Sequence, residues 1–199
     1  MKITLYVDVV SPFAYVAYHV LRSSSQNEPD KDRWIMKERL RWAKYFNVPI
    51  NADTPEGFPP LTLNVMRSIV AMGHLAGDGQ PLSSQPAQAA IVKALDAFFE
   101  AYWVKNRNVV DKDVMADILK AVGADVAKVT ELSAGGEAKQ TLLRNTDQAF
   151  ADGAFGLPWL VCENDKGEKE GFWGVDHLGV VLDFLGLEKP RAGGWRAML

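Results

Sequence analysis

The chain has 199 residues, of which 48% are hydrophobic, and its formal net charge at pH 7 is −3. This length suits one large domain or two small ones that share a core. The negative charge and the scattered basic residues argue against nucleic acid as a partner. No apolar run approaches the roughly 20 residues that span a membrane, so we expect no membrane partner.

Cysteine and histidine usage restricts the possible chemistry. The single cysteine, Cys162, excludes an internal disulfide, a CxxC redox motif and a cysteine-based zinc site. His19, His74 and His177 show no metal-ligand spacing, so we expect no metal. The chain enters a predicted strand almost at its first residue. We therefore expect no signal peptide and take the cytoplasm as the default location.

A strand followed by a helix is predicted at the start of the chain. Apolar residues alternate along residues 3–9, at Ile3, Leu5, Val7 and Val9. Ser11-Pro12 then combines a preferred helix N-cap with the residue favoured at the first helical position. The Ser11 hydroxyl therefore either caps this helix or also helps to hold an anion, such as a thiolate, carboxylate or phosphate, at its N-terminus.

The middle of the chain reads as helical throughout. Apolar spacing of about 3.6 residues predicts six helices. Asp111 is expected to cap the fourth of them. The predicted helices cover residues 32–47, 61–75, 85–105, 111–123, 124–134 and 137–153.

Strand signals return near the C-terminus. Residues 157–164 and 169–174 flank Asp165, Lys166 and Gly167, which predicts a β-hairpin. Residues 175–187 form a closing helix that begins at Asp176. An α/β beginning, a helical middle and a β-β-α ending imply that both ends of the chain build one sheet. We therefore expect a discontinuous domain, 1–30 and 154–199, with a helical insertion domain, 31–153.

Four stretches together resemble the kappa class of glutathione transferases. They are DVVSPFAYVAY (8–18), KERLRWAKYFNVPI (37–50) with the following FPPLTLNVMR (58–67), GAFGLPWLV (153–161) and FWGVDHL (172–178). The wider superfamily contains DsbA-type disulfide oxidoreductases and 2-hydroxychromene-2-carboxylate isomerases. The resemblance implies a thioredoxin-like α/β fold with an inserted helical domain and glutathione as co-substrate.

The resemblance also assigns roles to single residues. Ser11 would be the catalytic hydroxyl, at the position where redox relatives carry the first cysteine of CxxC; without that cysteine, dithiol chemistry is impossible. The backbone of Leu157 would pair with the cysteinyl part of glutathione, and Pro158 would be cis. Tyr6 and Tyr15 are rival thiol activators by chemistry, but neither lies at the helix start.

The two ends of glutathione would be held by charged residues. Asp176 would hold the glutamyl ammonium group, and its alternative role is to cap the last helix. Val175 stands where the family commonly has a serine, so one hydrogen bond to the glutamyl end would be missing. Lys31 would pair with the glycyl carboxylate or, alternatively, is a solvated charge beside acidic neighbours. Phe13, Tyr15 and Trp159 would line the site of a small-molecule electrophile, or are plain core aromatics.

One departure from the family pattern concerns the segment after the first helix. The family has a second strand and a loop there, whereas this chain has only the ten residues SSSQNEPDKD (23–32). The segment is too short and too polar to be strand plus loop. We expect a three-stranded sheet in which the edge of residues 3–9 is uncovered and open to pairing with another chain.

Three functions follow from these features. The first is a glutathione transferase that acts in conjugation or peroxide reduction. The second is a glutathione-dependent isomerase of the hydroxychromene-carboxylate type, and the third is an inactive or binding-only thioredoxin-fold form. The resemblance further implies a homodimer, and a peroxisomal or mitochondrial location beside the cytoplasmic default.

Overall fold

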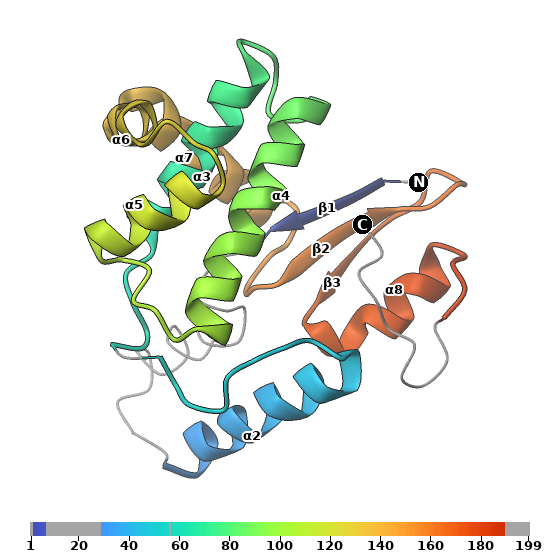
Figure 1. Cartoon of the computed structure of the whole chain (residues 1–199). Coiled ribbons are helices and arrows are strands. Elements are labelled where there is room, and N and C mark those ends of the chain that lie inside the picture. Colours follow the sequence, from blue (N-terminus) through green and yellow to red (C-terminus); the bar gives the residue numbers. More distant parts are fainter. Residues whose placement is uncertain (1, 7–28, 56, 190–199) are drawn as a thin grey trace. The chain divides into compact units, whose positions relative to one another are not determined.

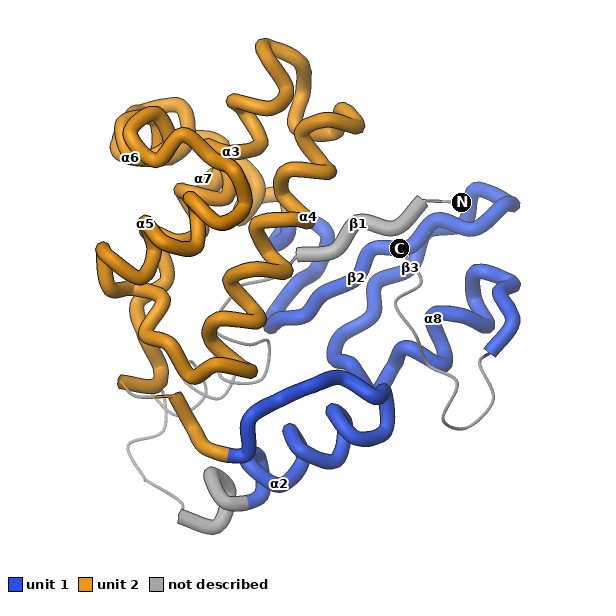
Figure 2. Tube along the Cα trace, viewed as in Figure 1, with its two compact units in different colours: residues 1–52, 149–199 blue, residues 53–148 orange. Residues whose placement is uncertain are grey.

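The computed structural model describes residues 2–6, 29–55 and 57–189 (Figure 1), with side chains from Trp34 onward. The contacts divide the chain into two units, which Figure 2 colours separately. The sheet unit comprises residues 1–52 and 149–199, and the helical unit comprises residues 53–148. The sequence placed residues 31–52 with the helical insertion, whereas the contacts group them with the sheet.

The sheet unit is built on three antiparallel strands in the order β1-β2-β3. They are β1 (Lys2–Tyr6), β2 (Trp159–Glu163) and β3 (Lys169–Trp173). Within the described ranges no strand pairs with the second edge of β1, as expected for a sheet without its second strand. Residues 7–9, which the sequence also assigned to the first strand, lie outside the described residues.

The predicted hairpin is confirmed, with β2 and β3 joined by a tight turn. The Asn164 side-chain oxygen accepts from the backbone N–H groups of Lys166 and Glu168, both at 3.0 Å. Gly167 supplies the left-handed residue of this turn, with φ +79°. The second strand begins at Trp159 rather than at Leu157, because Pro158 has no N–H to donate to the ladder.

The last helix differs from its prediction. Residues 175–177 form a 3₁₀ turn, η2 (Val175–His177), before α8 (Leu178–Phe184). The residue at the N-cap of α8 is His177, and no side chain caps this helix. The alternative role of Asp176 as helix cap is therefore wrong, since the 3₁₀ turn moves it one residue ahead of the cap.

The two faces of the hairpin carry separate apolar clusters because successive strand residues point to opposite faces. Leu160, Cys162 and Phe172 pack against Val181 of α8 and Leu185, the residue that follows this helix. On the other face, Trp159 packs with Ala149 in the last turn of α7 and with Ala154, which follows that helix. Leu157, Val161 and Trp173 pack against this cluster.

Cys162 gives a direct test of the first cluster. Its side chain is fully buried, and this burial raises the pKa of its thiol. We expect a water-soluble disulfide reagent to label Cys162 only after the sheet unit unfolds, which a labelling time course with and without urea measures.

The raised pKa of the Cys162 thiol also makes the free energy of unfolding depend on pH. Above the ordinary thiol pKa of about 8.5, the folded state retains a proton that the unfolded state releases, so the free energy of unfolding decreases as pH rises. A Cys162→Ala variant should lack this part of the decrease in urea titrations, and an identical pH dependence in both proteins would contradict the assignment.

The helical unit contains five of the six helices predicted for the middle region, whereas the first of the six, α2 (Pro29–Phe46), belongs to the sheet unit. The buried core of the helical unit includes Val65, Ile69, Phe98, Tyr102 and Leu119. The helices are α3 (Leu63–Gly77), α4 (Gln85–Phe99), η1 (Glu100–Val104), α5 (Lys112–Ala121), α6 (Val126–Ala134) and most of α7 (Gly136–Ala151).

Two details refine the helix predictions. Asp111 caps α5 as expected, because its carboxylate accepts from the N–H groups of Asp113 at 2.9 Å and Val114 at 3.1 Å. The predicted helix 85–105 is continuous but changes from α-helical to π-helical hydrogen bonding at Glu100. Among residues 29–55 and 57–189, no helix combines the length and apolarity needed to cross a membrane.

Candidate functional site

The loop before β2 and the turn after β3 meet at one end of the sheet. The Leu157–Pro158 peptide bond is cis, which confirms the expectation from the resemblance. The Pro158 carbonyl accepts a hydrogen bond from the Gly174 N–H at 3.1 Å. Trp159 lies opposite both Tyr6 and Trp173. The C-terminal end of β1, Tyr6, therefore lies at the same end of the sheet as Pro158 and Asp176.

Leu157 has an available backbone at this end of the sheet. It is half-buried and lies just before the strand ladder begins. Its N–H and C=O hydrogen-bond to no other backbone group in the described part of the chain. An extended peptide could therefore pair with Leu157 as an additional strand does.

The turn at Gly174 brings the Asp176 carboxylate close to the Gly174 backbone. The Gly174 backbone has φ +90° and ψ 154°, and a Cβ atom there would lie 2.4 Å from the Asp176 carboxylate. The carboxylate lies 3.5 Å from the His177 ring, and 49% of the Asp176 side chain is exposed. Val175, beside it, is half-buried and presents no polar group.

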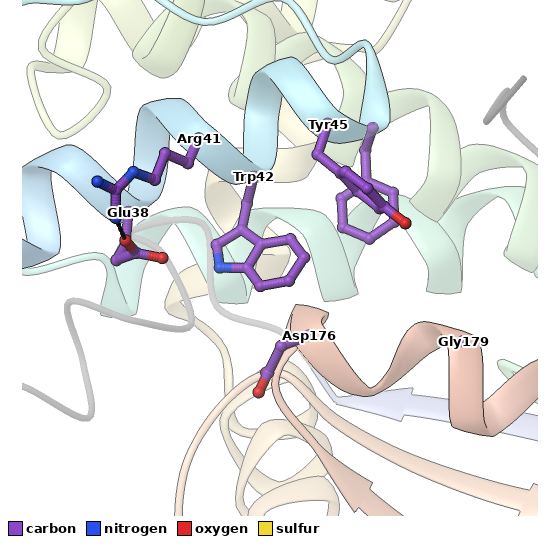
Figure 3. A pocket seen from close by; sticks show the side chains of 7 residues that line it. Glu38, Arg41, Trp42, Tyr45, Asp176 and Gly179 are labelled. Carbon is purple, nitrogen blue, oxygen red and sulfur yellow. Dashed lines mark hydrogen bonds and ion pairs between the residues drawn. The ribbon is translucent and has the colours of Figure 1, made fainter. Parts of the chain in front are cut away.

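A pocket of about 430 Å³ lies between η2 and the helix α2 (Pro29–Phe46), within the sheet unit (Figure 3). Figure 3 shows the Trp42 indole pointing from α2 toward Asp176. Trp42 stacks on Phe46 with ring centroids 5.7 Å apart, and Tyr45 meets Phe46 edge-on at 5.0 Å. The pocket is lined by Glu38, Arg41, Trp42, Tyr45, Phe46, Asp176 and Gly179.

The charged groups of this pocket are two carboxylates and one guanidinium. Glu38 is paired with Arg41, which lies one turn further along α2. Of the Glu38 side chain 18% is exposed, and of the Arg41 side chain 63%. With Asp176, the pocket therefore has a net charge of −1 from these three side chains.

An aromatic cluster lies on the sheet face beside the cis-proline loop. Trp159 is 8% exposed, and its ring covers Gly171, where a Cβ atom would lie 2.5 Å from the indole. Phe155 contacts the rings of Trp159 and Trp173 and is 69% exposed. The indole N–H groups of both tryptophans are buried without a hydrogen-bond partner among the described residues.

The predicted site residues are only partly brought together. The structure joins Leu157, Pro158, Val175 and Asp176 at one end of the sheet, with Trp159 next to them. The predictions for Ser11, Phe13 and Tyr15 lie outside the described residues. Lys31 lies in the first turn of α2, about two turns or roughly 10 Å along the axis from Glu38, and only its backbone is described.

Sequence reasoning missed the α2 wall of the pocket. Glu38, Arg41, Trp42 and Tyr45 follow the spacing i, i+3, i+4 and i+7, which places them on one helix face. Mixed charges and aromatics on one face were the available signal. In residues 29–55 and 57–189, no group of three or more His, Cys, Asp or Glu side chains could hold a metal ion.

Comparisons with known proteins agree with this arrangement. The model of the DsbA-like thioredoxin domain family matches residues 25–186. Glutathione S-transferase kappa 1 of Caenorhabditis elegans is 22% identical, covering 95% of this chain and 92% of its own length. Glutathione S-transferase kappa 2 of the same organism is 28% identical over 79% of this chain and 67% of its own length.

Among solved structures, a 2-hydroxychromene-2-carboxylate isomerase superposes with a TM-score of 0.66 at 17% identity, covering 94% of this chain and 95% of its own. The predicted thioredoxin-like fold and the resemblance to the kappa class are thereby confirmed. The alignment with the kappa 1 relative runs over 217 positions, more than the 199 residues of this chain, so it contains gaps on this side.

Proposed function

Because this chain belongs to the DsbA-like thioredoxin domain family, we propose that it is a glutathione transferase that binds the glutathione thiol as a thiolate at the Ser11 hydroxyl. The observation that carries the proposal is the hydrogen bond from Gly174 to the Pro158 carbonyl. It joins the loop with an available Leu157 backbone to the turn that bears Asp176. The kappa-class names of the two relatives support glutathione as the thiol.

Each part of glutathione has a proposed partner. The cysteinyl backbone pairs with Leu157, as an added strand would. Asp176 binds the glutamyl ammonium group, and Lys31 binds the glycyl carboxylate. A small-molecule electrophile then approaches the thiolate from the side of Trp159, where Phe155 offers an exposed ring. Phe13 and Tyr15 complete this apolar side, and the protein acts as a homodimer.

Ser11 can supply enough free energy to ionise the thiol. A thiol with a pKa near 8.5 needs a decrease of about 1.5 units to be half ionised at pH 7, which is about 2 kcal/mol. A hydrogen bond to a charged acceptor contributes roughly 1.5–3 kcal/mol, and a helix N-terminus adds about 0.3–1 kcal/mol. A hydroxyl at a helix start is therefore sufficient.

In the test, glutathione is titrated into the purified protein. Calorimetry measures the heat of binding, and the ultraviolet absorbance of the thiolate measures ionisation of the thiol. We expect binding with a thiolate signal at neutral pH that Ser11→Ala abolishes, as the glutathione pKa returns toward its ordinary value. Tyr6→Phe and Tyr15→Phe are matched controls, because each removes a rival hydroxyl and should leave the signal intact.

Two outcomes would contradict the proposal. A thiolate signal that persists in Ser11→Ala but vanishes in a tyrosine variant would assign activation to that tyrosine. Absence of glutathione binding by a folded protein would leave a thioredoxin-fold form without transferase activity.

A further inference from the structure

We infer that one face of α7 pairs with the same face of a second copy of this chain, with the two helices antiparallel and related by a two-fold axis beside Leu143. This inference rests on the homodimer in the proposed function, which assigned no surface to the contact, and it names that surface. The α7 face is defined by Gly136, Lys139, Leu143, Asp147 and Phe150, which belong to the single helix α7.

Two large apolar side chains are exposed on the α7 face. Leu143 is 59% exposed and Phe150 is 68% exposed. They are seven residues apart, which is about two helical turns, so they lie on the same side of α7. The buried residues of this helix, Ala138, Thr141 and Ala149, lie on its other side. Contact with another molecule would remove Leu143 and Phe150 from water, which favours association.

One basic and one acidic side chain flank Leu143 on this face. Lys139 lies four residues before Leu143 and Asp147 lies four residues after it, so the three share one side of the helix. Both charged residues are exposed, and neither forms an ion pair within the described part of the chain. Each charge is therefore available to a partner of opposite sign.

A two-fold axis beside Leu143 makes the charges of the α7 face complementary to themselves. In an antiparallel pair about this axis, Leu143 meets Leu143 of the second copy, and positions equally far before and after Leu143 are level with each other. Lys139 is therefore level with Asp147 of the second copy, and the axis repeats this pair. A parallel pair would instead bring like charges level with each other, which repel.

The apolar ends of the face are complementary in shape under the same symmetry. Gly136 and Phe150 are each seven residues from Leu143, so the axis places the Phe150 ring level with Gly136 of the second copy. Gly136 has no side chain, and a Cβ atom there would meet nothing within 4 Å. The ring therefore has room to lie against the Gly136 backbone. Shape and charge thus favour a second copy of this chain as the occupant.

The experiment reverses the charges of the face and measures self-association by sedimentation equilibrium. The variants are Lys139→Glu, Asp147→Lys, the double variant with both changes, and Leu143→Asp. The two charge reversals suit the helix dipole, because they add a negative charge toward the N-terminus of α7 and a positive one toward its C-terminus. Matched controls are Lys93→Glu and Val92→Asp on α4, where both residues are exposed. Circular dichroism checks that every variant is folded.

We expect a reversible wild-type dimer, because a contact made by one helix of about 24 Å is small. Lys139→Glu and Asp147→Lys should each weaken dimerisation about tenfold, since one reversal turns both symmetry-related pairs from attractive to repulsive. The double variant should dimerise as the wild type does. An equal mixture of the two single variants should also dimerise, because opposite charges then meet at both pairs. Leu143→Asp should be monomeric, and both controls should behave as wild type.

Three results would overturn the inference. A wild-type dimer that Lys139→Glu and Leu143→Asp leave unchanged would refute this surface but keep the homodimer of the proposed function. Failure of both the double variant and the mixture to restore dimerisation would refute the pairing of Lys139 with Asp147. A monomeric wild type at all concentrations would refute the contact and leave the α7 face to a partner of another kind. None of these measurements involves glutathione, so the Ser11-dependent thiolate stands or fails separately.

Discussion

A Gly174→Ala variant is expected to lose most of its affinity for γ-glutamyl compounds and to unfold at lower urea concentration. The Gly174 backbone, with φ +90° and ψ 154°, lies in a region that is essentially restricted to glycine. Forcing alanine into it raises the energy of the folded state by about 1–3 kcal/mol. A Cβ atom would also lie 2.4 Å from the Asp176 carboxylate, so Asp176 must move.

The matched control for this variant is Gly186→Ala. Gly186 also has a positive φ, of +68°, but a Cβ atom there meets nothing within 4 Å. We expect it to lose about 1–2 kcal/mol of stability while keeping wild-type affinity. Urea unfolding and S-methylglutathione titration of both variants separate the two effects. Wild-type affinity in Gly174→Ala would show that the position of Asp176 does not matter for binding.

Phe98→Ala in the helical unit is expected to cause a large loss of stability. The Phe98 side chain on α4 is fully buried. Truncating it removes apolar contacts and leaves a cavity, which lowers the free energy of unfolding by about 3–5 kcal/mol. Urea titration followed by far-ultraviolet circular dichroism measures the change, because helices dominate that signal.

Val92→Ala on the same helix is its control. Val92 is 53% exposed, and surface substitutions of this kind change stability by less than about 0.5 kcal/mol. Helix propensity favours alanine slightly, so the sign of the change should be neutral to stabilising. A similar loss of stability in both variants would mean that Phe98 does not anchor the core of this unit.

Local features of the structure could be predicted because short-range physics determines them. Asp111 caps α5 through the N–H groups of residues two and three positions later, so its role can be predicted from a few neighbouring residues. The hairpin turn depends on Asn164 and Gly167, which are also close in sequence. The cis geometry of Pro158 is different in kind, because it was expected from the resemblance and not from the residues themselves.

The turn at Asp176 shows where local reasoning failed. An aspartate before an apolar helical stripe is a common N-cap signal. In the structure, the segment after β3 forms a 3₁₀ turn. The Gly174 N–H donates to the Pro158 carbonyl, and the Gly174 carbonyl accepts from the His177 N–H. The first of these bonds joins the residue before β2 to the residue after β3, so it could not be predicted from the sequence around Asp176.

The sequence alone determined the order of the described helices and strands and the hairpin, because periodicity, caps and turn residues act over a few positions. The thioredoxin-like fold was expected from the resemblance of four stretches to a known family. Only the tertiary structure decided that Glu38, Arg41 and Trp42 share a pocket with Asp176. More than 130 residues separate Trp42 from Asp176 along the chain. Nothing local to either segment specifies their contact, which follows from how α2 packs in the sheet unit.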